Sequence, residues 1–335
     1  MSPYATAHIN PQGAGDARPT ALQIIHDESC EGKLLGKVVV ITGATSGIGI
    51  ETTRALSATG TILFLTTRNL KSAEGSLVGI LEPGRVSLVE MDNNSFASIR
   101  SAATTILTKL DNQVNILVDN AGVMGIERHT LTEDGHEVTF TTNHLSHFLL
   151  FQLLKPALLA SSTPDLHSRV VKVASSAHRA CVLPESNNYN FQKGGYNIAL
   201  AYSNSKLASV YMANELDRRY DRKGLHAASL HPGGIVTRIS RHIGSEFVKQ
   251  FTEDSVFSKH LKSPEQGAAT TVIAAVGREW ENRGGRYLED CVEAPRGEDD
   301  NNSVGVGFAR QTYDQENEER LRRDSLGIVG VEEDM

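Results

Sequence analysis

The chain has 335 residues, 39% of them hydrophobic and 22% charged, a balance typical of globular proteins, and its length allows one large α/β domain or two small ones. Its formal charge of −7, without a basic cluster, argues against nucleic acid as a partner. Three well-separated cysteines, Cys30, Cys181 and Cys291, predict reduced thiols rather than disulfides or a zinc site. No apolar run approaches the roughly 18 to 20 residues that span a bilayer, and no signal-peptide pattern is visible. We therefore expect a cytoplasmic protein without a membrane span.

Residues 1–35 are rich in Pro, Gly, Ala and Thr and lack periodicity, which predicts a flexible or loosely packed extension with a few helical residues near 22–26. From residue 36 onward, short apolar runs alternate with helical patterns. The runs typical of strands are 38–41, 62–67, 86–91, 114–118, 169–173, 226–230 and 286–288. The helical patterns cover about 50–59, 95–110, 134–159, 202–224 and 264–277. This alternation predicts a single α/β domain over 36–295 with a doubly wound parallel sheet and helices on both faces. A polar loop and a helical tail at 296–335 should pack on the same domain.

The first strand leads directly into a glycine-rich turn, Thr-Gly-Ala-Thr-Ser-Gly-Ile-Gly at 42–49, and then into a helix. Such a turn lets the backbone approach a pyrophosphate and points the amides of the helix N-terminus at it. A tight turn without a ligand is the alternative, but the strand before it and the helix after it favour nucleotide binding.

Polar residues at the ends of the next strands refine this prediction. In folds of this type an acidic residue after the second strand binds a free ribose 2′-hydroxyl, whereas arginine accommodates a 2′-phosphate. Arg68 occupies that place and no acid does, so NADP(H) is favoured over NAD(H), with a solvated surface arginine as the alternative. Asp92 follows the third strand and could cap the adenine edge, and Asn120-Ala121-Gly122 follows the fourth.

Tyr202 and Lys206 are four residues apart in a long helical pattern, which places both on one helical face. A phenol with a pKa of about 10 is a poor acid or base at neutral pH, and a neighbouring ammonium group lowers that pKa. Tyr202 could therefore exchange a proton with an alcohol or carbonyl oxygen. Tyr189 and Lys193 have the same spacing, but they lie in an Asn-rich segment followed by two glycines, which is typical of a loop. We favour Tyr202.

Ser175 follows the fifth strand and could donate a hydrogen bond to a developing oxyanion. With His178 nearby it also suggests a serine hydrolase, but the Gly-x-Ser-x-Gly elbow of many such enzymes is missing here. His144 and His147 lie without an accompanying set of carboxylates or cysteines, so they predict packing contacts rather than a metal site.

Taken together, these residues resemble the short-chain dehydrogenase/reductase family, most closely its retinol-dehydrogenase-like and WW-domain-oxidoreductase-like branch, over roughly residues 36–292. The phrases that carry the resemblance are Thr-Gly-Ala-Thr-Ser-Gly-Ile-Gly at 42–49, Asn-Ala-Gly-Val-Met at 120–124, Asn-His-Leu-Ser-His-Phe at 143–148, Ala-Tyr-Ser-Asn-Ser-Lys-Leu-Ala at 201–208, Leu-His-Pro-Gly at 230–233 and Arg-Tyr-Leu-Glu-Asp-Cys at 286–291. Their order and spacing are far more specific than any single phrase.

The resemblance implies a Rossmann-type fold and a catalytic tetrad of Asn143, Ser175, Tyr202 and Lys206. Tyr202 would be the general acid/base, Ser175 would polarise the carbonyl, Lys206 would lower the tyrosine pKa and hold the nicotinamide ribose, and Asn143 would position a water. Alignment of the family's Val-Ser-Ser phrase prefers Ser175 to Ser176. The expected cofactor-binding residues are Gly43, Thr45, Ser46, Gly47, Ile48, Gly49, Arg68, Asp92, Asn120, Ala121, Gly122, Tyr202, Lys206, Pro232, Gly233, Ile235 and Thr237.

Two features depart from the usual family pattern. Asp119 replaces the first asparagine of the usual Asn-Asn-Ala-Gly, which could alter cofactor affinity. The segment between Ser175 and Tyr202 is also longer than in many members, a feature common in the resembled branch. We expect the insertion at 179–200, together with a lid at 238–262, to determine specificity.

The sequence thus predicts an NADP(H)-dependent oxidoreductase that transfers a hydride between nicotinamide and a carbonyl or secondary alcohol of a small organic substrate. A catalytically idle NAD(P)-binding scaffold is the alternative. A homodimer is compatible with the resemblance, because the helices that carry Asn143 and Tyr202 often form the family's interface.

Overall fold

A computed structural model describes residues 4–109, 112–237, 239, 253–254 and 257–332. Its strands form one sheet in the order β3-β2-β1-β4-β5-β6-β7-β8, with all pairs parallel except the last. The strands are β1 (Val38–Thr42), β2 (Ile62–Thr67), β3 (Val86–Glu90), β4 (Ile116–Asp119), β5 (Ser168–Val173), β6 (Leu225–His231), β7 (Arg286–Glu289) and β8 (Val292–Glu293). The strand order reverses between β1 and β4, which is where open sheets of this kind form a ligand crevice. The sequence does not predict β8.

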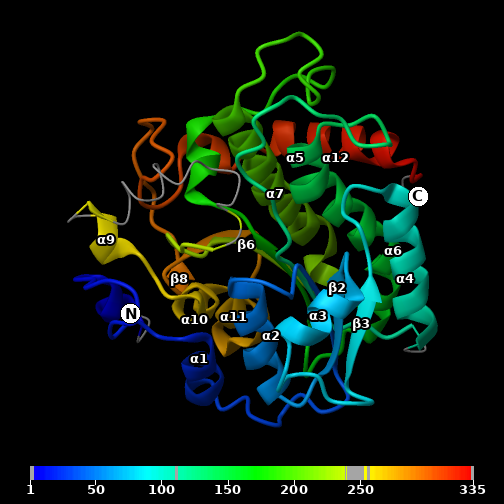
Figure 1. Cartoon of the computed structure of the whole chain (residues 1–335), viewed down its shortest axis with the longest axis vertical. Helices are drawn as coiled ribbons and strands as arrows, with labels where there is room; N and C mark the ends of the chain where they lie inside the picture. Colours follow the sequence, from blue (N-terminus) through cyan, green and yellow to red (C-terminus); the bar gives the residue numbers. More distant parts are fainter. Residues whose placement is uncertain (1–3, 110–111, 238, 240–252, 255–256, 333–335) are drawn as a thin grey trace.

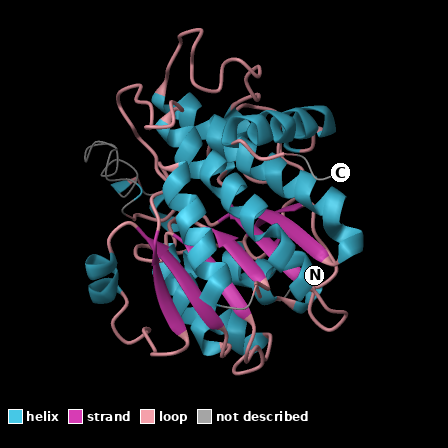
Figure 2. Cartoon of the chain, turned by 90° about the vertical axis from the view of Figure 1, so that its right-hand side faces the viewer, coloured by secondary structure: helices cyan, strands magenta, loops and turns pink. Residues whose placement is uncertain are grey.

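Helices cover both faces of the sheet (Figures 1 and 2). The longer helices are α1 (Ala21–Asp27), α2 (Ile48–Ala58), α3 (Leu70–Ser76), α4 (Phe96–Lys109), α6 (Ser146–Ser161), α7 (Ile198–Tyr220), α11 (Ala269–Val276) and α12 (Gln315–Val329). The short ones are α5 (Val138–Phe140), α9 (Phe257–His260), α10 (Pro264–Gly267), and the single turns η1 (Ala5–His8), η3 (Ser176–Ala180), η4 (Asp221–Lys223), η6 (Arg278–Trp280) and η7 (Arg310–Thr312). The predicted doubly wound α/β fold is confirmed. In the part of the chain that the structure describes, no helix is both long and apolar enough to cross a membrane.

The strand sequence explains the two layers. All five residues of β1 are buried, and they point alternately to opposite faces. Val38 and Val40 join a core with α4, α6, α7 and α12, whereas Val39 and Ile41 join a core with α1, α2 and α11. A strand that is apolar at every position must be covered on both faces, which is what the short apolar runs of the sequence indicate.

The long helical pattern predicted at 134–159 is divided in the structure. It begins at α5, continues as a π-helical turn η2 (Thr141–Leu145), and becomes regular only in α6. Such wide turns occur frequently at functional sites. Here the turn contains Asn143, whose side chain bonds to the backbone of Val123 outside the helix.

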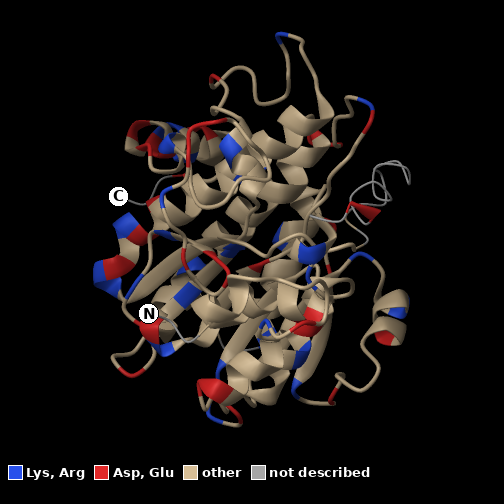
Figure 3. Cartoon of the chain, turned by 90° about the vertical axis from the view of Figure 1, so that its left-hand side faces the viewer, with Lys and Arg blue, Asp and Glu red and all other residues tan. Residues whose placement is uncertain are grey.

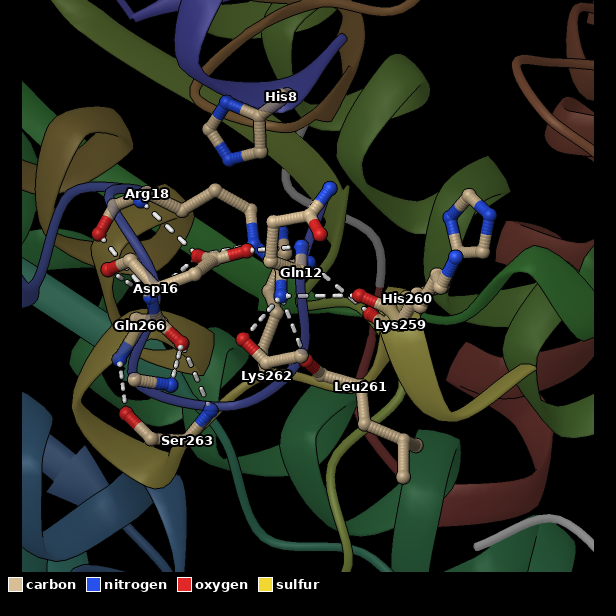
Figure 4. Close-up of polar contacts among 12 residues, drawn as sticks. His8, Gln12, Asp16, Arg18, Lys259, His260, Leu261, Lys262, Ser263 and Gln266 are labelled. Atoms are coloured by element: carbon tan, nitrogen blue, oxygen red, sulfur yellow. Dashed lines mark hydrogen bonds and ion pairs between the residues drawn. The ribbon is translucent and has the colours of Figure 1, made fainter. Parts of the chain in front are cut away.

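The N-terminal segment, for which the sequence predicts a flexible or loosely packed extension with a few helical residues near 22–26, contains α1 and is anchored to the rest of the fold. Ile24 and Ile25 of α1 are completely buried, and α1 packs on α11. Before α1, the buried guanidinium of Arg18 donates hydrogen bonds to the carboxylate of Asp16 and to backbone carbonyls at 13 and 259–261 (Figure 4). Composition describes a segment by itself and carries no information about these partners more than 240 residues away.

The C-terminal segment, for which the sequence predicts a helical tail packed on the same domain, forms α12. Leu321, Leu326 and Val329 are buried against the core that contains α7, and Glu318 and Arg322 are buried with them. Figure 3 shows acidic and basic residues interspersed around the face of the chain that it presents.

Candidate active site

A cavity of about 860 Å³ lies at the carboxyl ends of β1 to β6. The strand ends bring together most of the residues that the sequence singles out. The predicted residues that line the cavity are Gly43, Thr45, Ser46, Gly47, Ile48, Arg68, Asp92, Asn120, Ala121, Gly122, Ser175, Tyr202, Lys206, Pro232, Gly233, Ile235 and Thr237. Gly49 and Asn143 lie behind this lining. The predicted lid at 238–262 falls largely outside the described residues.

The glycine-rich turn between β1 and α2 needs glycine for two reasons. Gly43 has a φ of +64°, and a Cβ atom there would lie 2.7 Å from the Cα of Ala121. A Cβ on Gly49 would lie 2.1 Å from the carbonyl oxygen of Gly43. The turn therefore folds tightly under the start of α2 and leaves its backbone bare toward the cavity. This bare backbone at a helix N-terminus fits the pyrophosphate of a dinucleotide.

A chain of hydrogen bonds joins this turn to the middle of the sheet. The hydroxyl oxygen of Thr42 accepts bonds from the backbone amides of Asn120 and Ala121, both 3.0 Å away. Its own proton is then available for Nε2 of His147, at 2.9 Å, which leaves the Nδ1 proton of His147 for the carbonyl of Asn143, at 3.1 Å. Burial lowers the pKa of His147 well below its ordinary value, consistent with this neutral tautomer. The sequence does not assign His147 this positioning role.

The side-chain amide of Asn143 holds the turn that follows Asn120. Its oxygen accepts from the amide of Val123 at 2.8 Å, while its nitrogen donates to the carbonyl of Val123 at 3.0 Å and to the hydroxyl of Ser205 at 2.8 Å. Both amide hydrogens are therefore used within the protein. The described contacts give this side chain the task of fixing the turn against α7, beside the water-positioning role that the resemblance implies.

Ser175, Tyr202 and Lys206 meet at one end of the cavity. The side chain of Ser175 lies near enough to the Tyr202 hydroxyl to lower its pKa, and the Lys206 ammonium lies 5.6 Å from the centroid of the tyrosine ring. Lys206 also donates a 2.8 Å hydrogen bond to the carbonyl of Val173, at the end of β5. The helical spacing in α7 and the end of β5 thus place an acid/base group, a hydrogen-bond donor and an ammonium group around one small volume.

The electrostatics of this cluster differ from the expectation in one respect. The sequence predicts that Lys206 lowers the pKa of Tyr202, whereas burial raises the pKa of Tyr202 to about 12, opposed by the side chain of Ser175. Burial, together with the charge of Lys172, lowers the pKa of Lys206 to about 7. A lysine that is only partly protonated near neutral pH stabilises a phenolate less than a full charge does.

The neighbouring serine and histidine have other tasks. Ser176 donates to the carbonyl of Ser303 at 2.8 Å, away from Tyr202. His178 bonds through Nδ1 to the backbone carbonyl of Ser175 and through Nε2 to the hydroxyl of Thr312. It therefore does not act as a base on the Ser175 hydroxyl, and the hydrolase interpretation loses its geometric support.

The second tyrosine–lysine pair is structural. The Tyr189 hydroxyl donates to the carboxylate of Asp324 at 2.7 Å, and its ring stacks on Phe140. Lys193 pairs with Glu185 at the surface. The two side chains share no helical face, as the loop composition indicates.

In the described part of the chain no group of three His, Cys, Asp or Glu side chains could hold a metal ion. His144 forms a hydrogen bond with the hydroxyl of Ser325.

At the opposite end of the cavity, Arg68 follows β2 and Asp92 follows β3. Arg68 is exposed, and its guanidinium makes no hydrogen bond or ion pair with any residue that the structure describes. Asp92 accepts from the amide of Asn94 at 3.0 Å, which shapes its turn. A cation at this edge is thus available to an anionic group of a ligand.

Several lining residues are not among the site residues that the sequence singles out, although three of them belong to the insertion at 179–200 that is expected to determine specificity. They include Met124, Asn197, Ile198, Ala199, Ser303 and Val304. Only Asn197 could have been recognised, since it caps the start of α7 by accepting from the amide of Leu200. The loop that carries Ser303 and Val304 reaches the cavity through contacts with η3, more than 120 residues earlier in the chain.

Comparisons with known proteins agree with this geometry. A family model described as short chain dehydrogenase matches residues 37–247. The chain is 45% identical to the short-chain dehydrogenase/reductase prx1 of Penicillium roqueforti, over 98% of this chain and 96% of that protein. It is 35% identical to a WW domain-containing oxidoreductase of Gallus gallus, over 93% of this chain and 73% of that protein. A crystal structure of a putative uncharacterized protein from Mycobacterium paratuberculosis, 26% identical, superposes with a TM-score of 0.67 over 92% of this chain and 98% of that chain.

Together these matches extend over nearly the whole chain, and members of the family are oxidoreductases that use a nicotinamide cofactor. The chain therefore belongs to the short-chain dehydrogenase family, within the branch that includes the retinol dehydrogenases and the WW-domain oxidoreductases.

Proposed function

We propose that this protein is an NADP(H)-dependent oxidoreductase that interconverts a carbonyl group and a secondary alcohol on a small organic molecule, with Tyr202 as the general acid/base. The observation that carries the proposal is the meeting of Ser175, Tyr202 and Lys206 at one end of a cavity whose other end is the glycine turn. When bound, a nicotinamide cofactor supplies or accepts the hydride.

The residues have separate tasks in this proposal. Ser175 donates a hydrogen bond to the substrate oxygen, which polarises the carbonyl. During reduction Tyr202 gives its phenol proton to that oxygen, and it must then be reprotonated before the next turnover. During oxidation Tyr202 takes the proton from the alcohol. The protonated form of Lys206 stabilises the phenolate of Tyr202. Asn143 and His147 hold the turn and the strand end against which these groups are aligned.

The cofactor preference rests on Arg68. Its exposed guanidinium lines the cavity at the end of β2. An acidic residue at this place would instead favour a cofactor with a free ribose 2′-hydroxyl. A planar guanidinium suits a phosphate group through paired hydrogen bonds. We therefore propose NADP(H) rather than NAD(H).

The direct test compares two tyrosine variants with purified protein and NADPH over a panel of ketones, aldehydes and quinones. Tyr202→Phe should lower turnover by about 10² to 10⁴-fold while cofactor still binds. Tyr189→Phe is the matched control and should retain turnover, because its hydroxyl bonds within the fold, donating to Asp324 and accepting from Arg320. Full activity in Tyr202→Phe would refute the assignment. Cofactor binding without turnover of any substrate by the wild type would favour an idle scaffold.

A further inference from the structure

The loop at residues 298–307 forms a wall of the cavity beside the tyrosine. Ser303 and Val304 line the cavity, and Val304 keeps 51% of its surface exposed. In Figure 1 this loop, in orange, lies beside the green segment that follows β5. From sequence alone it is a polar loop without an assigned role.

One buried side chain makes most of the contacts that position the loop. Arg179, in η3, is 1% exposed, and all five of its N–H donors are directed at this segment. The acceptors are the backbone carbonyls of Glu298, Asn302, Val306 and Gly307 and the carboxylate of Asp300. An arginine whose five donors are all used defines the path of the loop around it.

Two glycines permit this enclosure. A Cβ atom on Gly297 would lie 2.2 Å from Nη1 of Arg179, and one on Gly305 would lie 2.7 Å from Nη2. The loop therefore closes on the guanidinium at a distance that only glycine allows. Ser176 adds a second link from η3, since its hydroxyl donates to the carbonyl of Ser303 at 2.8 Å. Both links begin within four residues of Ser175 in the chain, so the wall and the proposed oxygen-binding serine are positioned together.

The lining of the cavity includes the apolar side chains of Met124, Ile198, Ala199, Ile239 and Val304, together with uncharged polar ones such as Ser176, Asn197 and Ser303. Among the described lining residues the charged side chains are Arg68, Asp92 and Lys206. Arg68 and Asp92 follow β2 and β3, at the far edge of the sheet, and Lys206 is 3% exposed and bonded to the carbonyl of Val173. His231, which also lines the cavity, is neutral near pH 7, since burial and the charge of Lys262 lower its pKa to about 3.

We propose that the loop at 298–307, positioned by Arg179, selects the substrate, that Val304 and Ile198 contact the part of the substrate beyond the reacting carbon, and that this part is apolar and uncharged. The inference rests on the proposed oxidoreductase function. A charged group against Val304 and Ile198 would lose part of its hydration without a counter-charge from these two side chains, which disfavours it relative to an apolar group. A hydrocarbon group would bury apolar surface against both side chains.

Two ketones of equal length test the charge preference. They are 2-octanone and 7-oxooctanoate, which share the methyl ketone and differ only in a terminal methyl or carboxylate. We expect kcat/KM of the wild type to be at least about tenfold higher for 2-octanone. Val304→Arg should reverse this preference, because it places a cation at the wall.

Val306→Arg is the matched control, since Val306 belongs to the same loop, is 69% exposed and does not line the cavity. It should keep the wild-type preference. Equal kcat/KM for both ketones in the wild type, or equal effects of the two arginine variants, would overturn the inference. The inference would also be overturned if the enzyme reduced other carbonyls in a Tyr202-dependent manner but not 2-octanone. That result would leave the proposed function intact. Loss of all turnover despite cofactor binding would instead refute the proposed function.

Arg179→Lys tests the positioning role. Lysine has three donors on one nitrogen and cannot reach five acceptors. We expect KM for 2-octanone to rise about tenfold or more with kcat and the Kd of NADPH little changed. A variant that folds, as judged by its Tm, and keeps the wild-type KM would contradict the role. If Arg179→Lys does not fold, Val304→Ala provides a second test, because it leaves Arg179 in place. It should raise KM for 2-octanone by several-fold, and an unchanged KM would contradict the proposed contact of Val304 with the substrate.

Discussion

The ammonium group of Lys172 lies 3.0 Å from a carboxylate oxygen of Asp119, across the neighbouring strands β5 and β4. The two side chains are 1% and 0% exposed. Burial raises the pKa of Asp119 and lowers that of Lys172, and the attraction between the groups opposes both shifts. Asp119 is the residue that departs from the family's usual asparagine, and the structure shows that a buried cation accompanies it.

Removal of one partner of this pair should be costly. Lys172→Met leaves a carboxyl group buried without its counter-charge, which should lower the free energy of unfolding by about 3–5 kcal/mol. The double variant Lys172→Met/Asp119→Leu should recover most of that loss, because apolar residues can replace a buried ion pair. Urea unfolding of the wild type, both single variants and the double variant measures the coupling. Additive effects of the two substitutions would show that the pair does not act as a unit.

Arg68 should discriminate between the two nicotinamide cofactors. Arg68→Ala removes a cation that the described part of the protein leaves free for a phosphate, so kcat/KM for NADPH should fall by about tenfold or more. The value for NADH should change little, because NADH has no 2′-phosphate. Arg54→Ala is a suitable control, since Arg54 is an exposed residue of α2 paired with Glu51. Equal losses with both cofactors would contradict the assignment.

The pH dependence should report the ionisation of Lys206. Its pKa is lowered to about 7 by burial and by the charge of Lys172, so the protonated form prevails below that pH and is lost above it. We expect kcat/KM for the cofactor, which reflects groups of the free enzyme, to fall as pH rises through about 7. Arginine stays protonated throughout, so Lys206→Arg should lose this inflection even if its activity is lower. Initial rates from about pH 5.5 to 9 decide the matter, and an identical inflection in both proteins would assign it to another group.

The N-terminal segment should contribute measurably to stability. Arg18→Ala removes one donor of the partly buried Asp16 carboxylate and the donor of several backbone carbonyls, so the free energy of unfolding should fall by about 2–4 kcal/mol. Arg54→Ala, at the surface, should cost less than about 1 kcal/mol. If residues 1–35 were the flexible extension that their composition predicts, Arg18→Ala would cost no more than this control. Urea unfolding at neutral pH distinguishes the two cases.

The contribution of Asp16 to that stability should depend on pH. Burial alone would raise the pKa of Asp16, but hydrogen bonds from the Arg18 side chain and from the amide of Gln12 lower it well below its ordinary value. A carboxyl group with a depressed native pKa stabilises the fold above its unfolded pKa of about 4 and loses this effect as the pH falls. The difference between wild type and Arg18→Ala should therefore shrink as the pH is lowered below about 4.

Much of the fold could be predicted because its signals are local. The run at 62–67 coincides with β2, which is largely apolar because both faces of the strand are covered. The run at 169–173 lies within β5 and is recognisable from its valines, although the strand also buries Arg169 and Lys172. Tyr202 could be preferred to Tyr189 for a similar reason: glycine and asparagine composition distinguishes a loop from a helix within a few residues. By contrast, the burial of Ile24 and Ile25 depends on α11, whose residues lie far away in sequence, and no local pattern indicates it.

By itself, the sequence determined the parallel α/β architecture, because that follows from local apolar and helical patterns. Its motifs also indicated the family, and the resemblance to that family implied most of the residues that line the cavity. Only the tertiary structure decided that a loop 119 to 128 residues further along closes on Arg179, which brings Val304 to the cavity, and that Lys172 is paired with Asp119. It also decided the direction of the Tyr202 pKa, which burial raises. Desolvation and long-range hydrogen bonds depend on what surrounds a group in space, and a pattern along the chain does not contain that information.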